Sequence, residues 1–353
     1  MAGPKVVEHG SCQSLWQLTP TSSVARLMRC GYASYRAIAV RTLLACCSVT
    51  TVAHTESDLP PEVGYNYGEV ETPRSMALGG AQRATSYSVG GLFSNPANMA
   101  RTAVYHLGGI AEVWPEANRI SFGGAAVDSI VNSKGIAGGL GYTYNQQDKG
   151  GLDRQYNDLR FALAFPMQDK FFLGLGGRYL WLAQNGFGPL GSSLASGGLK
   201  NERIIKGFSF DAGVTLKPTD ELYVAVVGSN LSDPGNGFQP LTAGGGVGFA
   251  NKDFGAEADV TFDFTTWDET KLRAMGGVEL LIDDSVPIRA GYRYDAGAES
   301  HAVSAGVGYI ERAFSAEAAV RRVVSGDKAT AIVLGVTLHL EASGLTPAPA
   351  SAF

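Results

Sequence analysis

The stretch Phe254-Gly-Ala-Glu-Ala-Asp-Val-Thr-Phe-Asp-Phe264 alternates apolar and polar residues along its length. Side chains of a β-strand point to opposite faces with a period of two. One face of this stretch is therefore apolar, and the other carries Glu257, Asp259 and Asp263. Residues 208–217 alternate in the same way. Both stretches predict amphipathic β-strands that hold one face against an apolar environment.

Segments of this kind follow one another through the rest of the chain, and we count about fourteen. Most have about 9–11 residues, the length that a tilted strand needs to cross a bilayer. The connections are local, and those after odd-numbered segments are often the longer ones, as in barrels with short turns at one rim and longer loops at the other. The segments are 103–113, 119–128, 136–144, 158–166, 171–182, 207–217, 222–231, 241–250, 254–264, 271–281, 286–295, 302–310, 314–323 and 330–340.

This pattern predicts an all-β fold, a closed antiparallel transmembrane β-barrel of about 14 strands over residues 102–340. A soluble all-β protein is the alternative, because its strands also alternate. In a membrane barrel the polar face lines the lumen, where buried charges need partners. We expect those partners on neighbouring strands. The predicted lumenal charges are Arg160, Arg178, Asp211, Glu257, Asp259, Asp263, Arg273, Arg289, Arg293, Glu317 and Arg321.

Composition excludes several classes of protein. The chain has 353 residues and is 45% hydrophobic, yet it has no run of about 18 apolar residues, as a membrane helix requires. A net charge of −5 argues against a nucleic-acid-binding surface. All four cysteines precede Ser48, so neither a disulfide nor a cysteine-based site is expected after it. The 46 glycines often lie within apolar stretches, where glycine marks bends, bulges and close approach of backbones.

The first 53 residues are predicted to be an export signal. Basic residues precede a short apolar run and then small residues, the order found in secretory signal peptides. Translation is expected to start at Met28 and cleavage to fall near Ala53. Lipidation at Cys46, within Leu43-Leu44-Ala45-Cys46, is the alternative that the sequence leaves open.

Residues 54–101 break the alternation and are predicted to form a small N-terminal hatch, or plug. They contain Leu78-Gly79-Gly80-Ala81 and Asn95-Pro96-Ala97-Asn98-Met99. A glycine- and alanine-rich segment, an Asn-Pro-Ala box and then a barrel resemble the start of the outer-membrane fatty-acid channel superfamily (FadL-like), including its PorV-like branch. The resemblance implies that the hatch occludes the lumen. The residues that carry this hatch motif are Gly79, Gly80, Ala81, Asn95, Pro96, Ala97 and Met99.

The resemblance also implies passive uptake of small hydrophobic molecules such as long-chain fatty acids. Substrates would be captured by an extracellular loop and released sideways through the barrel wall. The loop 183–206 carries the expected capture residues, and the expected opening is a glycine-rich strand. The expected capture residues are Phe187, Leu190, Leu194 and Leu199. The glycines of the expected wall opening are Gly135, Gly138, Gly139 and Gly141. The compact chain keeps open a PorV-like alternative, a barrel that serves protein secretion or surface assembly without transport of its own.

No enzyme activity, cofactor or metal is predicted. The histidines lie on separate segments without a nucleophile motif, although His106 and His339 fall on the first and last strands and meet where the barrel closes. The expected location is the bacterial outer membrane. The expected partners are its lipids, hydrophobic small molecules, the barrel-assembly machinery and, in the PorV-like alternative, secretion or surface proteins. Residues 341–353 are expected to form a C-terminal tail.

Overall fold

The computed structural model describes residues 63–132, 134–185 and 204–342. The chain divides into two units, Met1–Val52 and Ala53–Phe353, and every described residue belongs to the second. The predicted export signal, including Cys46 and Ala53, lies outside the described residues. The predicted capture residues Phe187, Leu190, Leu194 and Leu199 also lie outside them.

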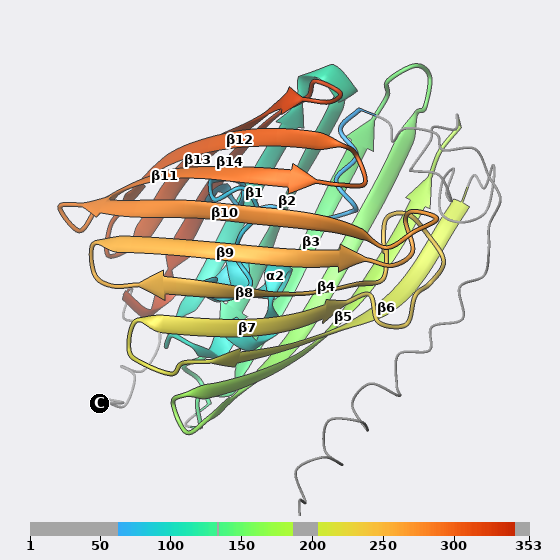
Figure 1. The fold of residues 1–353 in the computed structure, drawn as a ribbon. Helices are drawn as coiled ribbons and strands as arrows, with labels where there is room; N and C mark the ends of the chain where they lie inside the picture. Colours follow the sequence, from blue (N-terminus) through green and yellow to red (C-terminus); the bar gives the residue numbers. More distant parts are fainter. Residues whose placement is uncertain (1–62, 133, 186–203, 343–353) are drawn as a thin grey trace, which may run out of the picture. The chain divides into compact units, whose positions relative to one another are not determined.

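The fourteen strands of the described residues form a closed antiparallel barrel (Figure 1). Each strand pairs with the next one in the sequence, and β1 closes the barrel against β14. The predicted closed antiparallel barrel of about 14 strands is confirmed. The strands are β1 (Tyr105–Trp114), β2 (Arg119–Asp128), β3 (Ala137–Gln147), β4 (Arg154–Met167), β5 (Phe171–Ala183), β6 (Ile204–Leu216), β7 (Leu222–Ser229), β8 (Thr242–Ala250), β9 (Phe254–Asp263), β10 (Lys271–Ile282), β11 (Val286–Asp295), β12 (Ser300–Ile310), β13 (Phe314–Ser325) and β14 (Thr330–His339).

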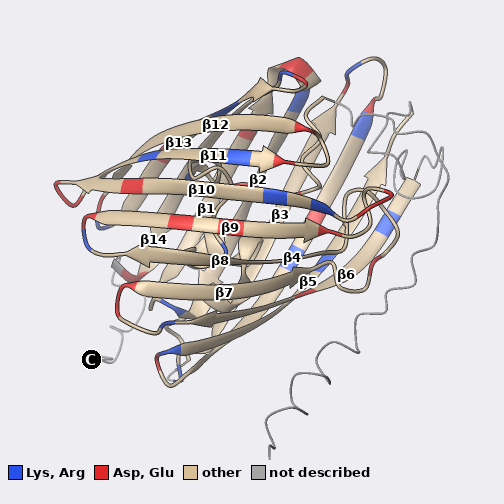
Figure 2. Cartoon of the chain, viewed as in Figure 1, with Lys and Arg blue, Asp and Glu red and all other residues tan. Residues whose placement is uncertain are grey.

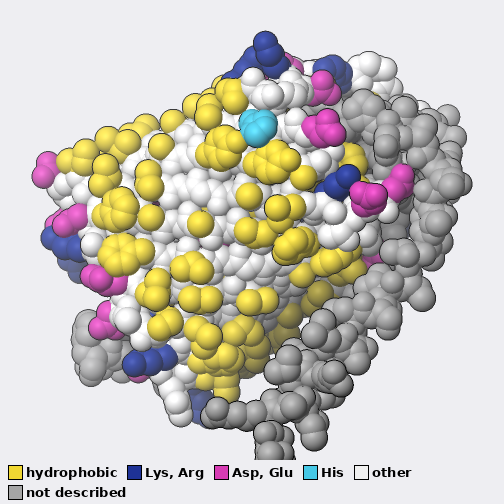
Figure 3. Space-filling view, viewed as in Figure 1, with side chains coloured by type: hydrophobic (Ala, Val, Ile, Leu, Met, Phe, Trp, Pro, Cys, Tyr) yellow, Lys and Arg dark blue, Asp and Glu magenta, His cyan; other side chains and the backbone are white. Residues whose placement is uncertain are grey.

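The outer wall of the barrel is apolar. Along β9 the apolar residues Phe254, Val260 and Phe262 are exposed, while Glu257 and Asp259 between them are buried. Figure 3 shows hydrophobic side chains spread over the wall and charged side chains gathered toward its ends. Such a surface suits lipid rather than water. The alternation therefore places its apolar face outward, as predicted for a membrane barrel.

The two rims differ in the length of their connections. Turns after even-numbered strands include 168–170, 251–253 and 283–285, whereas the longer connections 184–203 and 230–241 follow β5 and β7. Figure 2 shows charged residues at many of the turns. Short turns at one rim and longer loops at the other are the pattern of outer-membrane barrels. Among the described residues, no helix is long and apolar enough to cross a membrane.

The segment 63–104, which we call the hatch, precedes β1 and packs against the inner side of the wall. It contains the helix α1 (Pro73–Ala77), the helix α2 (Ser88–Ser94) and the 3-10 helix η1 (Pro96–Ala100). α1 contacts β11 to β14, α2 contacts β1 to β4, and η1 contacts β3 to β6. Two further 3-10 helices lie outside the hatch, η2 (Pro115–Ala117) between β1 and β2 and η3 (Leu340–Ala342) after β14. The hatch thus bridges strands on several sides of the barrel.

Candidate functional site: the hatch and its contacts with the wall

The Asn-Pro-Ala box forms η1 and is anchored to β6. Asn95 caps η1, because its side-chain oxygen accepts a hydrogen bond from the Ala97 amide at 3.1 Å, and proline suits the first turn that follows. The Asn95 Nδ2 donates to Thr215 Oγ1 on β6 at 2.9 Å. The Thr215 hydroxyl in turn donates to Asn98 Oδ1 at 2.7 Å. The box is therefore a buried polar junction between the hatch and the wall.

The Gly-Gly-Ala part of the motif forms the turn after α1. Gly79 and Gly80 have φ angles of 70° and 95°, a backbone region that favours glycine. The Gly79 amide donates to Ser304 Oγ at 3.1 Å, and the Arg293 Nε donates to the Gly79 carbonyl at 3.0 Å. Ala81 follows in a fully buried position. The structure thus brings the two halves of the sequence motif into contact with opposite sides of the wall. Pro96, Ala97 and Met99 are also buried.

Carboxylates of the hatch meet arginines of the wall. Glu69 lies 2.8 Å from Arg273 Nη1 and 3.4 Å from Arg293 Nη2. Glu71 lies 3.3 Å from Arg293 Nη2 and also pairs with Arg321. Because these groups are largely removed from water, each pair depends on its partner to offset the cost of burying charge. The hatch is held electrostatically to β10, β11 and β13.

Arginines of the hatch reach in the opposite direction, to carboxylates of the wall. Arg74 lies 3.1 Å from Glu279 on β10, and Arg83 lies 3.2 Å from Asp259 on β9. Asp259 also accepts hydrogen bonds from the Gln82 and Arg83 amides at 2.8 and 2.9 Å. Glu257 accepts from the Ala84 and Thr85 amides at 2.5 and 3.1 Å. The acidic face of β9 is thus a docking surface for hatch residues 82–85.

This geometry corrects one expectation from the sequence. The lumenal charges were expected to find partners on neighbouring strands, and some do. Arg289 of β11 pairs with Glu279 of β10, and Arg178 of β5 pairs with Asp158 of β4. Arg289 also pairs with Glu317 two strands away on β13, and Arg160 pairs with Asp158 of its own strand. The carboxylates of β9 instead bind mainly hatch amides, and Arg273, Arg293 and Arg321 bind hatch carboxylates. The remaining predicted charges bind loops: Asp211 accepts from the Asn230 amide, and Asp263 accepts from the Thr265 and Thr266 amides.

Acidification is expected to weaken the Glu69 contact. Burial raises the pKa of Glu69, but the positive charges of Arg273 and Arg293 outweigh it, and the pKa falls from 4.5 to about 2. A carboxyl whose pKa is lowered on folding stabilises the fold above its unfolded pKa and loses that contribution as the pH falls. Between about pH 4.5 and pH 2 the free energy of unfolding should drop by on the order of 2 kcal/mol from this group, after allowance for solvent screening.

The measurement is urea unfolding of the barrel in lipid vesicles at a series of pH values. Glu69→Gln should flatten the pH dependence over this interval while leaving the stability near pH 2 little changed. The same pH dependence in the variant and the wild type would contradict the assignment.

The predicted wall opening at β3 is not found in this structure. β3 pairs with β2 from Gly138 to Gln147, and with β4 from Ala137 to Gln147, without a break. Gly139 and Gly141 lie against the hatch residue Leu92, so these glycines make room for the hatch instead of weakening the pairing. Gly135 lies in the turn before β3 with a φ of 69°.

The shortest pairing of neighbouring strands in the barrel is between β6 and β7. It runs only from Ala212 opposite Gly228 to Leu216 opposite Val224. The loop 230–241 covers the remaining edge of β6, because the Leu231 amide donates to the Phe210 carbonyl at 2.8 Å. Phe238 of the same loop packs inside the barrel against Tyr156, with ring centroids 5.1 Å apart. The wall here consists partly of a loop.

The described interior holds two small cavities. One, of about 60 Å³, adjoins Ser88, His106 and Gly108. The other, of about 70 Å³, lies between the hatch and the arginines Arg160 and Arg273. Ligand pockets for small molecules usually measure roughly 300–1,000 Å³. Neither of these two cavities would hold a solute of that size without movement of the hatch or of a loop.

These features define the class of the protein: it is a closed β-barrel of the outer-membrane type, with the segment 63–104 packed against the inner side of its wall. No protein-family model and no curated protein matches the sequence. Among solved structures, the toluene transporter TbuX of Ralstonia pickettii matches with a TM-score of 0.58 at 14% identity, covering 78% of this chain and 99% of TbuX. The monoaromatic hydrocarbon channel CymD gives the same four values.

A Pseudomonas aeruginosa FadL homologue matches with a TM-score of 0.51 at 14% identity, over 80% of this chain and 99% of that one. The chain therefore has the fold of the FadL-type channels, as the sequence motif predicted. The fold does not distinguish the PorV-like branch. The proteins it resembles are named as a transporter and a channel.

Proposed function

We propose that the chain is a passive channel through which small hydrophobic molecules cross the outer membrane. The observation that carries the proposal is the fold, which matches nearly the full length of a toluene transporter and of a monoaromatic hydrocarbon channel. Diffusion down a gradient needs no cofactor or energy-coupling domain. Long-chain fatty acids and monoaromatic hydrocarbons are the two substrate classes to compare.

The closed interior sets a condition on the mechanism. Cavities of about 60 and 70 Å³ are smaller than the engineered cavity of roughly 150 Å³ that holds benzene in another protein. To enter either cavity, even a single aromatic ring therefore requires rearrangement of the residues around it. Movement of the hatch around η1 would break the hydrogen bonds that Asn95 and Asn98 make with Thr215. Movement of the loop 230–241 would open the wall beside β6.

The test is uptake by a bacterium that lacks its own fatty-acid channel. Labelled oleate and labelled toluene are supplied separately, and folding is checked by heat-dependent gel mobility. We expect uptake of at least one of them to exceed that of an empty-vector strain. Replacing Phe187, Leu190, Leu194 and Leu199 together by serine should reduce it several-fold, because capture by the loop depends on apolar surface.

A matched control changes polar residues of the same loop, Ser192, Ser193 and Ser196, to threonine and should leave uptake unchanged. Equal losses in both variants would contradict capture by the apolar residues. A correctly folded barrel that takes up neither compound would contradict the channel. That outcome would favour the PorV-like alternative. The next experiment would then identify secretion or surface proteins that co-purify with the barrel.

A further inference from the structure

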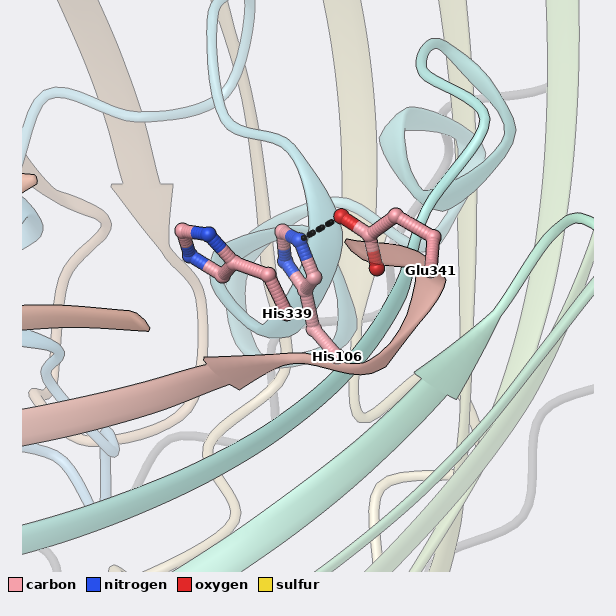
Figure 4. A group of neighbouring side chains, drawn as sticks. All are labelled: His106, His339 and Glu341. Carbon is pink, nitrogen blue, oxygen red and sulfur yellow. Dashed lines mark hydrogen bonds and ion pairs between the residues drawn. The ribbon is translucent and has the colours of Figure 1, made fainter. Parts of the chain in front are cut away.

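Three potential metal ligands meet where the barrel closes. His106 of β1 lies directly opposite His339 of β14, and their rings stack with centroids 4.5 Å apart. Glu341, in η3 just after β14, lies 2.9 Å from His106 Nε2 through its Oε1 (Figure 4). One ligand atom from each residue can be chosen so that all three lie within 4.8 Å of one another. We call His106, His339 and Glu341 the seam cluster.

Each member of the seam cluster has a second partner that orients it. His106 Nδ1 lies 2.7 Å from the Ser88 hydroxyl of α2. The Tyr105 amide donates to Glu341 Oε2 at 3.0 Å, which leaves Oε1 directed at His106. His339 Nδ1 lies 3.3 Å from the Arg312 carbonyl. Metal-binding histidines usually have such a partner on the nitrogen that does not bind the metal.

The charges of the cluster suit a divalent cation. Glu341 brings a carboxylate to the two imidazoles, and a hydrogen bond from the Tyr105 amide holds that carboxylate in place. Two neutral imidazoles and one carboxylate are a ligand set that proteins use for zinc, with water in the fourth position.

The surroundings allow an ion to enter. His106 is buried, whereas His339 and Glu341 are only half-buried at the rim of the barrel. The cavity of about 60 Å³ is lined by Ser88, His106 and His339. Ser88, His106 and Glu341 also form a chain of hydroxyl, imidazole and carboxylate, as in the catalytic triad of a hydrolase. The cavity beside them is, however, too small for a substrate of ordinary size. It has room for an ion and a few waters.

We propose that the seam cluster binds one Zn²⁺-type divalent ion through His106, His339 and Glu341. The ion joins the first strand, the last strand and the segment that follows it. Because His106 also contacts Ser88 of α2, a bound ion stabilises both the closure of the barrel and the seat of the hatch. Binding of an ion at the seam cluster does not depend on which substrate the proposed channel carries.

The test uses the full chain purified in detergent without a polyhistidine tag, stripped with EDTA and dialysed. Zn²⁺ binding is measured by titration calorimetry, and Co²⁺ is used to report coordination through its visible absorption. We expect one equivalent of either ion and a four-coordinate cobalt spectrum. Zn²⁺ should also raise the temperature at which the folded band is lost on gels.

Variants assign the ligands. Ser88→Ala should weaken Zn²⁺ binding about 10- to 100-fold, the effect usual for an orienting partner, and His339→Asn should weaken it more. Glu341→Gln should also weaken binding more, although its side-chain oxygen can still accept from the Tyr105 amide. His301→Asn is the matched control, because His301 lies on β12 and contacts only Tyr292 and Tyr294 among the interactions described.

Two results would overturn the proposal. One is a folded wild type that binds neither ion after stripping. The other is binding by the folded His339→Asn and Glu341→Gln variants that equals that of His301→Asn, because zinc would then sit elsewhere in the chain. Two independent ligand variants keep the test informative if one of them fails to fold.

Discussion

Replacing Glu71 by alanine is expected to lower the free energy of unfolding by about 3–5 kcal/mol, the usual cost of removing one partner from a buried ion pair. Glu71 is 4% exposed and pairs with Arg293 and Arg321 on two different strands. Glu69 remains within 3.4 Å of Arg293, but Arg321 has no other carboxylate among the ion pairs of the described residues. The variant therefore leaves a buried guanidinium without its counter-charge.

The measurement is urea unfolding in lipid vesicles, followed by tryptophan fluorescence. Glu71→Gln retains the size and hydrogen-bonding oxygen of the side chain, so it should fall between the wild type and Glu71→Ala. The control is Glu311→Ala, because Glu311 is exposed in the turn between β12 and β13 and should change stability by less than about 0.5 kcal/mol. Similar stabilities for Glu71→Ala and Glu311→Ala would show that the pair does not hold the hatch.

The barrel could be predicted from the sequence because lipid imposes one repeated constraint on every strand. Phe254, Val260 and Phe262 face outward because the outer face of every strand meets lipid. The alternation of apolar and polar residues with a period of two shows this constraint within each strand. Local turns then fix the order of strands. The closure of β1 against β14 follows once the count is even and the sheet has no free edge.

The partners of the lumenal charges could not be predicted in the same way. The parity of Glu257 places it inside, but its partners are the Ala84 and Thr85 amides, which lie more than one hundred residues earlier in the chain. Contacts between the hatch and the wall depend on how an irregular segment folds inside the barrel. The hatch sequence has no repeating pattern from which these contacts could be predicted. Glu71 and Glu341 carry no local signal for their roles either.

The glycines did carry a signal that the sequence analysis missed. Gly139 shares the inward parity of Thr143 and Asn145, and Gly138 the outward parity of Leu140. Glycines of inward parity recur on β5, β6, β10 and β11, where Gly174, Gly213, Gly277 and Gly291 meet atoms of the hatch. The parity of a glycine tells whether it faces the lumen or the lipid. Glycines that face the lumen predict a groove shaped for the hatch backbone, and not a weak point in the strand.

The consecutive glycines Gly276 and Gly277 of β10 provide the test of this groove. A Cβ added at Gly277 would lie 2.6 Å from the Leu78 Cα in the turn after α1, closer than real Cβ contacts. At Gly276, which faces outward, the nearest atom would be the Glu257 carbonyl oxygen at 3.6 Å, an ordinary contact. Gly277→Val is therefore expected to displace the hatch, whereas Gly276→Val should leave it seated.

Overpacking of this kind costs about 1–3 kcal/mol. If that cost falls on the seated hatch alone, the population of molecules with a displaced hatch rises by roughly 5- to 150-fold. Ion conductance of the purified barrel in planar bilayers should rise accordingly in Gly277→Val, and trypsin should cleave the hatch at Arg74, Arg83 and Arg101 more quickly. Gly276→Val receives the same side chain on the same strand, so it controls for the loss of glycine itself. Equal conductance in the two variants would mean that the hatch tolerates the added methyl groups and that the inward glycines are not what seats it.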